Sequence, residues 1–372
     1  MAKLRVGIIG CGDVAQHTYL PGLARMHKEG LLEFAAVSDV LGDRVRLAQK
    51  RYGIAQGYTD YHELLAKADV DLVVNLTPTQ YHAEVILAAI DAGKHVYTEK
   101  PIAATIEEAD RIIEAARQAG VTVGSAPAVM THPELQELKD MVARGQIGNV
   151  CFARARGSHP GPDRLMDFLT DPSWFYKPGA GPVIDLGIYQ IQALTGILGP
   201  AKRVTAFGGI AIPDRVNLAG IAAGKQYTAE VEDNVHILLD FGNACFAYVD
   251  ATFCVLSAKG PRLELYGRSG VIYAYARPED PPMEVFVWDQ EHEFRGWAQP
   301  EKVYRGSLMP GRAPAVRPDW SLASGVEHMA HALAGETALV VTAEHARHTL
   351  EIILSAMQSV REGRAIDLKT SF

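Results

Sequence analysis

Short apolar runs alternate with segments of helical periodicity through the first third of the chain. Strand-like runs occupy residues 4–9, 34–38, 72–76, 95–98 and 122–124. Helical periodicity lies between them and is clearest over residues 106–118, where Ile112, Ile113 and Ala116 share one face and charged residues occupy the other. Alternating strands and helices form βαβ units, so this part of the chain is predicted to be an α/β domain with a doubly wound parallel sheet.

The pattern changes after residue 125. A predicted helix over residues 133–144 leads to a strand over 150–156, and strand-rich sequence follows over residues 203–294. Two further helices are expected near residues 322–334 and 343–362. We therefore predict two domains, one over residues 1–125 and an α+β domain over residues 126–372. Residues 306–318 are rich in proline and arginine and are expected to form an exposed loop or an arm that contacts another subunit.

A glycine-rich loop follows the first apolar run directly. In the spacing G-x-G-x-x-A the first glycine permits a tight turn, the second lets the backbone approach a pyrophosphate, and the alanine allows close packing of helix on strand. The free N–H groups at the start of the following helix favour phosphate. The loop, with its flanking strand and helix, predicts a dinucleotide site formed by Gly10, Cys11, Gly12, Asp13, Val14 and Ala15.

The second predicted strand ends at Asp39, which bears on the choice of cofactor. A carboxylate at this position can accept hydrogen bonds from both ribose hydroxyls of NAD, and it repels the 2′-phosphate of NADP. Arg44 lies on the next predicted helix and is expected to face solvent or to lie near the adenine. The sequence therefore predicts NAD as the cofactor rather than NADP.

The predicted strand over residues 95–98 leads into Glu99, Lys100 and Pro101. Ligands of an open parallel sheet bind beyond the carboxyl ends of its strands, where this strand delivers a glutamate and a lysine together. A lysine there can donate a hydrogen bond to a substrate oxygen, and the following proline disfavours helical geometry at Lys100. Glu-Lys-Pro alone is equally typical of a solvated surface, but beside a dinucleotide loop it makes Lys100 a catalytic candidate.

A second glycine-rich stretch, residues 178–182, precedes a predicted helix on which Asp185 and Tyr189 are four residues apart and share a face. Gly187 between them costs helix stability relative to alanine, which suggests close approach by a ligand or another backbone. Such a pair is more often structural than catalytic. Hydride transfer needs a proton donor, however, and this makes both residues catalytic candidates.

Composition excludes several classes of partner. The chain has 372 residues, a net charge of −8 and 22% charged residues without a basic block, so nucleic acid and anionic membranes are poor partners. The four cysteines form no C-x-x-C pair, and the 13 histidines show no metal-ligand spacing, so we predict no metal. The chain opens directly into a strand without a signal-peptide pattern, and a cytoplasmic location is expected.

The order of these motifs resembles the Gfo/Idh/MocA oxidoreductase family over nearly the whole chain. The resemblance rests on the glycine-rich loop, Asn75-Leu76-Thr77-Pro78 with His82, Glu99-Lys100-Pro101, and the helix from Asp185 to Tyr189. It implies a Rossmann domain followed by a domain with a large, mostly antiparallel sheet that often forms the oligomer interface. A homo-oligomer, dimer or tetramer, is therefore expected. Many members carry a histidine where this chain has Tyr189.

The resemblance also implies the activity of an NAD(P)-dependent dehydrogenase or reductase. Hydride would move between nicotinamide and a hydroxyl or carbonyl group of a sugar, a cyclitol or a related small polyol. Thr77, Pro78, His82 and Glu99 are implied to lie beside the cofactor. His82 at the start of a helix is about as often a cap or a core residue.

The predicted chemistry places a substrate hydroxyl between Tyr189 and Lys100. Tyr189 transfers the proton while hydride moves, and the positive charges of Lys100 and oxidised nicotinamide lower its pKa. Asp185 would orient Lys100 or hold a second hydroxyl. His159 and Trp174 lie between the site-bearing segments and are expected to line the substrate pocket, because sugars stack on aromatic faces. The alternative for these two residues is a packed lid without ligand contact.

Two other classes of function remain open at this point. One is a non-catalytic regulator that senses NAD or a metabolite, since a fold does not guarantee an activity. The other is a glycoside-cleaving enzyme that uses bound NAD transiently, without net reduction of added NAD. Both would contain the same dinucleotide loop.

Overall fold

The computed structural model describes residues 3–165, 168, 170–275, 283–289, 294–298 and 322–372. They divide into two compact units at Thr131 and His132, close to the predicted boundary after residue 125. The described residues 322–350 belong to the first unit, whereas residues 351–372 belong to the second. The predicted arm over residues 306–318 lies outside the described residues.

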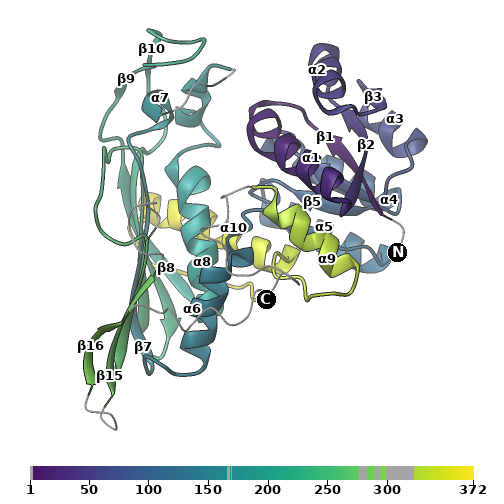
Figure 1. Ribbon diagram of the computed structural model, residues 1–372. Helices are drawn as coiled ribbons and strands as arrows, with labels where there is room; N and C mark the ends of the chain where they lie inside the picture. Colours follow the sequence, from purple (N-terminus) through teal and green to yellow (C-terminus); the bar gives the residue numbers. More distant parts are fainter. Residues whose placement is uncertain (1–2, 166–167, 169, 276–282, 290–293, 299–321) are drawn as a thin grey trace. The chain divides into compact units, whose positions relative to one another are not determined.

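The described part of the first unit contains a six-stranded parallel sheet (Figure 1). Its strand order is β3-β2-β1-β4-β5-β6, with the order reversing between β1 and β4. This confirms the doubly wound arrangement. The short β3 was not predicted, because its three residues include no apolar run. The strand bounds are β1 (Leu4–Ile9), β2 (Leu32–Ser38), β3 (Gln56–Tyr58), β4 (Leu72–Asn75), β5 (His95–Thr98) and β6 (Val123–Ser125).

Helices cover both faces of this sheet. Val73 and Val74 are neighbours on β4, and because successive side chains of a strand point to opposite faces, they belong to two different apolar clusters. The cluster around Val74 includes residues of α9, and the cluster around Val73 includes residues of α5. The helices are η1 (Ala15–Tyr19), α1 (Leu20–Glu29), α2 (Gly42–Tyr52), α3 (Tyr61–Lys67), η2 (Thr79–Tyr81), α4 (His82–Asp91), α5 (Ile106–Ala119), η3 (Val129–Thr131), α9 (Ser324–Leu333) and the first part of α10 (Ala343–Glu362).

The helix that was clearest in the sequence, α5, has defined signals at both ends. The Thr105 side chain accepts a hydrogen bond from the Glu108 N–H, and the Glu108 side chain accepts one from the Thr105 N–H, which forms a capping box. Gly120 ends the helix in the left-handed conformation, with φ of 66°. Local sequence therefore determines this element almost completely.

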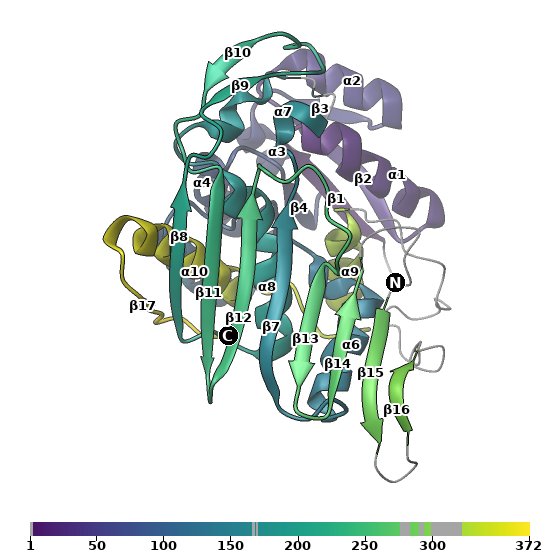
Figure 2. The same cartoon turned by 90° about the vertical axis from the view of Figure 1, so that its left-hand side faces the viewer.

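The second unit contains a nine-stranded mixed sheet among its described residues, with the order β16-β15-β14-β13-β7-β12-β11-β8-β17. Figure 2 looks onto this sheet. β7 and β12 run parallel, and the other neighbouring pairs that the structure describes run antiparallel, as the family resemblance implied. The bounds are β7 (Val150–Ser158), β8 (Arg203–Gly209), β11 (Asn234–Gly242), β12 (Cys245–Thr252), β13 (Leu263–Gly267), β14 (Gly270–Ala274), β15 (Met283–Asp289), β16 (Phe294–Ala298) and β17 (Ile366–Asp367).

Helices of the second unit cover one face of its sheet. On β7, Ala153 and Ala155 are buried beneath α8, whereas Arg154 points to the other face and is exposed. This alternation is typical of a sheet with one face covered. The remaining elements are α6 (Pro133–Ala143), which packs on α8 (Ile188–Leu198), α7 (Pro162–Leu165), η4 (Pro172–Tyr176), η5 (Val183–Gly187) and the strand pair β9 (Asp214–Val216) and β10 (Gln226–Thr228).

The helix predicted to carry Asp185 and Tyr189 is not a uniform α-helix. Residues Val183–Gly187 form a π-helical stretch, and regular α8 begins at Ile188. A π turn is wider than an α turn, so a spacing of four residues spans less than one turn there. Gly187 lies against β12, where a Cβ atom would come within 3.1 Å of the Ala251 Cβ. The close approach predicted from Gly187 is therefore made by a neighbouring strand.

Each helix among the described residues is either too short or too polar to span a lipid bilayer.

Candidate cofactor and catalytic site

The glycine-rich loop connects β1 to η1 through the tight turn that its first glycine predicted. Gly10 has a φ of 98°, and a Cβ atom there would lie 2.6 Å from the carbonyl oxygen of Leu76. Only glycine fits, because both the backbone conformation and the close approach exclude a side chain. The Gly10 N–H donates to the Ser38 carbonyl across 2.8 Å, which ties the loop to the end of β2.

Asp39 is bound to the same loop. Its Oδ2 atom accepts a hydrogen bond from the Cys11 N–H at 2.8 Å, and its Oδ1 atom accepts one from the Leu41 N–H at 2.9 Å. The residue is buried, which fixes its carboxylate beside the phosphate loop. Carboxylate oxygens have lone pairs left for the ribose hydroxyls after these two bonds.

Arg44 lies closer to this acid than its sequence position suggested. Its Nη1 atom is 3.8 Å from the Asp39 Oδ2 atom, and it would lie 3.7 Å from a Cβ atom placed on Gly12. The guanidinium therefore lies at the phosphate loop, although the side chain remains about one-third exposed, at 37%. The sequence had left two positions open for Arg44, in solvent or near the adenine. The structure places its guanidinium at the edge of the predicted nucleotide site.

Cys11 lies inside the loop, and its thiol has low reactivity. Its thiol is fully buried, and burial together with the Asp39 charge raises its pKa to about 12. A thiol with such a pKa carries almost no thiolate at neutral pH and is a poor nucleophile. Cys11 thus acts as a small filler beneath the loop.

At the end of β5, Glu99 organises the chain around Lys100. The Tyr19 hydroxyl donates to the Glu99 Oε1 atom at 2.6 Å, and the Lys100 backbone N–H donates to the Oε2 atom at 2.9 Å. Glu99 is buried and Lys100 is half-buried. The glutamate thus fixes the backbone of the lysine, and it connects this strand end to η1, which follows the phosphate loop.

His82 holds two neighbouring loops together. Its Nδ1 atom is 2.7 Å from the Pro101 carbonyl oxygen and its Nε2 atom is 2.8 Å from the Thr77 carbonyl oxygen. The ring is only 1% exposed, and burial lowers its pKa. This placement agrees with the core alternative that the sequence left open. His82 connects the segment containing Thr77 and Pro78 to the segment containing Lys100.

Thr77 and Pro78 follow β4 in a loop held by Asn75. The Asn75 Oδ1 atom accepts hydrogen bonds from the Thr77 N–H at 3.2 Å and from the Thr77 hydroxyl at 2.7 Å. Its amide donates to the Thr98 hydroxyl on β5 at 3.1 Å. Asn75 is fully buried, so this network is rigid and aligns the ends of β4 and β5.

The second unit holds Asp185, Tyr189, His159 and Trp174. Asp185 lies in the π-helical stretch, and Tyr189 is the second residue of α8. Both residues are partly exposed. The His159 Nε2 atom is 4.0 Å from the Asp185 Oδ2 atom. The structure therefore brings His159 and Asp185 together, which the sequence did not predict.

Trp174 lies in η4 and exposes about half of its surface, at 52%. Its ring stacks on Phe175 with a centroid distance of 3.8 Å. An aromatic face held in this way and open to solvent is suited to stacking on a sugar ring.

A buried charge cluster that sequence reasoning missed lies beneath these residues. The Arg215 guanidinium is 2.7 Å from the Asp233 carboxylate and 3.4 Å from the Asp163 carboxylate, and all three side chains are at most 2% exposed. Asp163 also accepts a hydrogen bond from the Tyr176 hydroxyl. These four residues come from α7, η4, β9 and the segment before β11, so no local spacing in the sequence relates them.

Arg262 is a second residue that sequence reasoning missed. It precedes β13, and its guanidinium lies 3.0 and 3.2 Å from the side-chain oxygen of Gln190 once that amide is oriented to accept. Burial lowers the pKa of Arg262, whereas a negative charge on Tyr189 would stabilise the charged guanidinium. A cation thus faces the start of α8, where the sequence had suggested only Lys100 as the basic partner of Tyr189.

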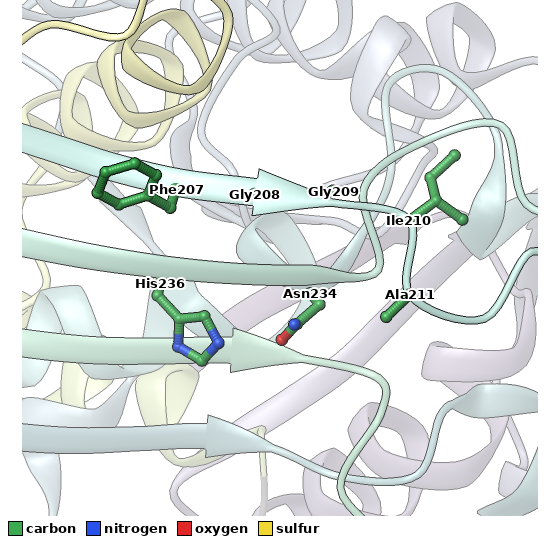
Figure 3. Close-up of a pocket in the computed structure, with 7 residues that line it drawn as sticks. All are labelled: Phe207, Gly208, Gly209, Ile210, Ala211, Asn234 and His236. Atoms are coloured by element: carbon green, nitrogen blue, oxygen red, sulfur yellow. The ribbon is translucent and has the colours of Figure 1, made fainter.

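A shallow hollow of about 290 Å³ lies elsewhere, at the ends of β8 and β11 (Figure 3). Its lining is mainly apolar, and it includes none of the predicted site residues. The lining contains no carboxylate, lysine or arginine, and its titratable residue is His236, whose Nδ1 atom lies 2.6 Å from the Tyr248 hydroxyl oxygen. The lining residues are Phe207, Gly208, Gly209, Ile210, Ala211, Asn234 and His236.

The fold and the phosphate loop define an NAD-binding oxidoreductase of the Rossmann type. A family model described as "Oxidoreductase family, NAD-binding Rossmann fold" matches residues 4–126, and one described as "GFO/IDH/MocA C-terminal domain" matches residues 135–273. The chain belongs to the Gfo/Idh/MocA oxidoreductase family, as the order of its motifs suggested.

Relatives with assigned names span most of the chain. It is 26% identical to myo-inositol 2-dehydrogenase of Thermotoga maritima over 272 residues, which is 73% of this chain and 75% of that protein. It is 27% identical to 1,5-anhydro-D-fructose reductase of Ensifer adhaerens over 351 residues, covering 91% of this chain and 99% of that protein.

Solved structures agree with the fold. An NAD-binding oxidoreductase from Klebsiella pneumoniae superposes with a TM-score of 0.84 at 23% sequence identity, and the match covers 100% of both chains. At this identity the likeness establishes the shared architecture.

Proposed function

We propose that this enzyme transfers hydride between NAD and a hydroxyl or carbonyl group of a sugar, a cyclitol or a related small polyol. The observation that carries the proposal is the position of Lys100, fixed through Glu99 and Tyr19 beside a preformed dinucleotide loop. The named relatives act on a cyclitol and on an anhydro sugar, which supports this substrate class.

Lys100, Asp185 and Tyr189 are proposed to act on the same substrate hydroxyl. Lys100 would donate a hydrogen bond to the reacting oxygen, and Tyr189 would take the proton of the substrate hydroxyl during oxidation and return it during reduction. Asp185 holds Lys100 or a neighbouring hydroxyl. The Arg262 guanidinium lies against the side chain of Gln190, the residue after Tyr189, and a cation close to a tyrosine favours its phenolate form.

The cofactor residues are proposed to act as a preassembled set. NAD supplies the hydride acceptor when it is bound. The backbone of residues 10–15 would hold the pyrophosphate, and Asp39 the adenosine ribose. Thr77 and Pro78 would line the cofactor beside Lys100, and Glu99 and His82 would hold that edge of the site in place. The exposed ring of Trp174 and the imidazole of His159 would line the substrate side.

The proposal is tested by incubating the pure protein with NAD and a panel that includes myo-inositol, 1,5-anhydro sugars and common hexoses. Appearance of reduced cofactor is followed by its absorbance at several pH values. We expect turnover with at least one polyol or sugar, and loss of most of it in Tyr189→Phe, with Tyr248→Phe on β12 as the control. NAD binding without turnover would favour the regulator, and glycoside cleavage without net NAD reduction would favour the glycoside-cleaving alternative.

We also propose that the chain forms a homo-oligomer through the uncovered face of the nine-stranded sheet, with a second copy of the same chain as the partner. Phe207, Leu238 and Phe246 expose their side chains on three adjacent strands of this face, β8, β11 and β12. Exposed apolar groups gathered in this way are typical of interaction surfaces, and a flat face can pair with its own copy about a two-fold axis.

Light scattering coupled to size-exclusion chromatography tests this interface. We expect a dimer or a tetramer for the natural chain and a smaller species for Phe207→Asp. Leu256→Ser is the matched control, because Leu256 is also exposed but lies in a loop outside the sheet. A monomeric natural chain would refute the proposal.

The cytoplasmic location remains a prediction, which cell fractionation can test.

A further inference from the structure

The imidazole of His159 has both ring nitrogens in defined surroundings. The Gly161 N–H donates a hydrogen bond to the His159 Nδ1 atom at 2.9 Å. An Nδ1 atom that accepts carries no proton, so the neutral ring must carry its proton on Nε2. Nε2 is the nitrogen that lies 4.0 Å from the Asp185 Oδ2 atom. The backbone thus selects the tautomer that directs an N–H group at the carboxylate.

The ring itself is held in place. It stacks on Phe253 with a centroid distance of 5.3 Å and an interplanar angle of 16°. The backbone of His159 is paired on both sides, since its N–H donates to the Thr252 carbonyl at 3.1 Å and its carbonyl accepts from the Val255 N–H at 3.4 Å. Neither the ring nor its backbone can turn away from Asp185 without breaking these contacts.

The buried charge cluster fixes the group that selects the tautomer. Gly161 has a φ of 108°, and a Cβ atom there would overlap the Asp163 carboxylate and the Tyr176 hydroxyl. The backbone of Gly161 therefore packs directly against Asp163 and the Arg215 Nη1 atom that pairs with it, so the charge cluster limits where the Gly161 N–H can lie. Asp233 provides the second carboxylate that pairs with Arg215. Its backbone carbonyl accepts a hydrogen bond from the Phe253 N–H at 2.8 Å, so the cluster also positions the Phe253 ring on which His159 stacks.

We propose that His159 is a positioning residue for Asp185. The Gly161 N–H fixes its neutral Nε2–H tautomer, and this Nε2–H group orients the Asp185 carboxylate across the 4.0 Å gap through one bridging water, because the gap is too long for a direct hydrogen bond. The role in turnover rests on the proposed function, whereas the tautomer and its effect on Asp185 do not.

The charges around His159 are compatible with a neutral ring. Asp185 of η5 and Asp163 of α7 face it, and Arg215 of β9 partly offsets the charge of Asp163. Burial lowers the pKa of His159 and outweighs the two carboxylates, which raise it. The imidazole is then neutral near pH 7, as the tautomer argument requires. An added proton on Nδ1 would face the Gly161 N–H and break that hydrogen bond.

Nuclear magnetic resonance of protein carrying ¹⁵N-labelled histidine tests the tautomer. His159 is assigned from the signal that disappears in His159→Gln. We expect a protonated Nε2 and an unprotonated Nδ1 between about pH 6.5 and 8, the range in which a neutral imidazole is expected. A protonated Nδ1, or an imidazolium signal at neutral pH, would overturn the proposal. His95 is an internal reference, because its Nδ1 atom also accepts a backbone N–H, from Thr122 at 2.9 Å.

The effect on Asp185 is read from its ¹³C-labelled carboxyl group, assigned with Asp185→Asn. His159→Phe keeps a ring to stack on Phe253 but has no nitrogen, so the Asp185 resonance should move. His159→Gln keeps an N–H donor and should restore most of the natural position, whereas His95→Phe should leave it unchanged. An Asp185 resonance that does not respond to His159→Phe refutes the positioning role.

Steady-state turnover with an accepted substrate tests whether His159 contributes to catalysis. His159→Phe should lower kcat roughly ten- to hundredfold with a smaller change in KM, since misplacing a positioned group costs rate more than binding. His159→Gln should recover part of that loss. Equal kcat in His159→Phe and the natural chain would refute the role in catalysis. If no compound is turned over, the proposed function fails, while the two resonance measurements still decide the arrangement of His159 and Asp185.

Discussion

The backbone N–H of Cys11 donates a hydrogen bond to the Asp39 carboxylate across 2.8 Å. This contact joins the loop that follows β1 to the acid that follows β2, and the Gly10 N–H adds a second connection to the same strand end. The two halves of the nucleotide site are therefore assembled by the protein itself. A site preorganised in this way loses less ordering entropy when its ligand binds.

Asp39→Ala is expected to weaken NAD binding by about tenfold or more, which corresponds to about 1.4 kcal/mol or more. The substitution removes an acceptor for the ribose hydroxyls and leaves the N–H groups of Cys11 and Leu41 without their carboxylate. It should also narrow the preference for NAD over NADP, because it removes a repulsion from the 2′-phosphate. Calorimetric titration of both cofactors into both proteins measures the two effects.

The natural chain should bind NAD at least about tenfold more tightly than NADP, since like charges a few ångströms apart in a partly desolvated cleft cost on the order of 1 kcal/mol or more. Asp43→Ala is the matched control, because Asp43 is also an acid next to an arginine but its side chain is 92% exposed. Equal affinities in the natural chain would mean that Arg44, 3.8 Å from Asp39, or another cation reaches the 2′-phosphate.

Lys100→Met should reduce turnover by orders of magnitude while NAD affinity changes little. Methionine keeps the unbranched shape and most of the length of the side chain but removes the cation that would polarise the substrate oxygen. The Glu99 contacts to Tyr19 and to the backbone of residue 100 do not depend on the lysine side chain. Initial rates and cofactor titration separate the two quantities. Lys94→Met, just before β5, is the control and should keep normal rates. Natural turnover in Lys100→Met would remove Lys100 from the mechanism.

Arg215→Met should lower the free energy of unfolding by about 3–5 kcal/mol, because it leaves two buried carboxylates without their cation. Asp163 and Asp233 are at most 2% exposed, so water cannot replace the guanidinium. Urea unfolding followed by circular dichroism measures the change. Arg203→Met is the matched control, since the Arg203 side chain is 53% exposed in its pair with Asp240 and should contribute about 1 kcal/mol at most. Equal losses in the two variants would contradict this account.

Stability should also fall as pH drops from about 6.5 toward 4, in part because of His328. Burial, and then the charge of His331, lower the pKa of His328 to about 4 in the folded protein. The Nε2 atom of His328 accepts the Val340 N–H at 3.0 Å, and a proton there would break that bond. Between these pH values the unfolded chain takes up a proton that the folded chain does not, so acid favours unfolding.

His328→Gln should flatten this pH dependence, because a glutamine carbonyl can accept the Val340 N–H but does not titrate in this range. Urea midpoints measured at several pH values for both proteins provide the comparison. His17→Gln is the control, since the His17 side chain is 53% exposed. The prediction is wrong if the natural chain and His328→Gln lose stability in parallel between pH 6.5 and 4.

Local sequence predicted the first unit well because its signals are local. The apolar run of β1, the glycines of the loop and the capping box of α5 each involve residues within a few positions of one another. The positions of Asp39 and Lys100 at strand ends could be predicted because strand ends in a parallel sheet gather at one edge, so position along a strand already predicts position in space. Arg44 was less predictable, because a long side chain can reach solvent or the loop from the same backbone.

The second unit was harder to predict because its contacts join distant segments. His159 and Asp185 are 4.0 Å apart through the pairing of β7 with β12 and the packing of η5 on both strands. The π-helical form of Val183–Gly187 was also missed, since helical periodicity in a sequence does not distinguish an α turn from a π turn.

The sequence by itself determined the class of protein and its cofactor and predicted which residues face that cofactor, because a glycine-rich loop, a strand-end acid and a strand-end lysine are encoded in short stretches of chain. Only the tertiary structure decided how the buried charges Asp163, Arg215 and Asp233 pair and which tautomer His159 adopts. Those arrangements depend on burial and on the mutual orientation of groups from separate elements. Charges and rings of this kind find their partners only when the sheet and its covering loops have folded around them.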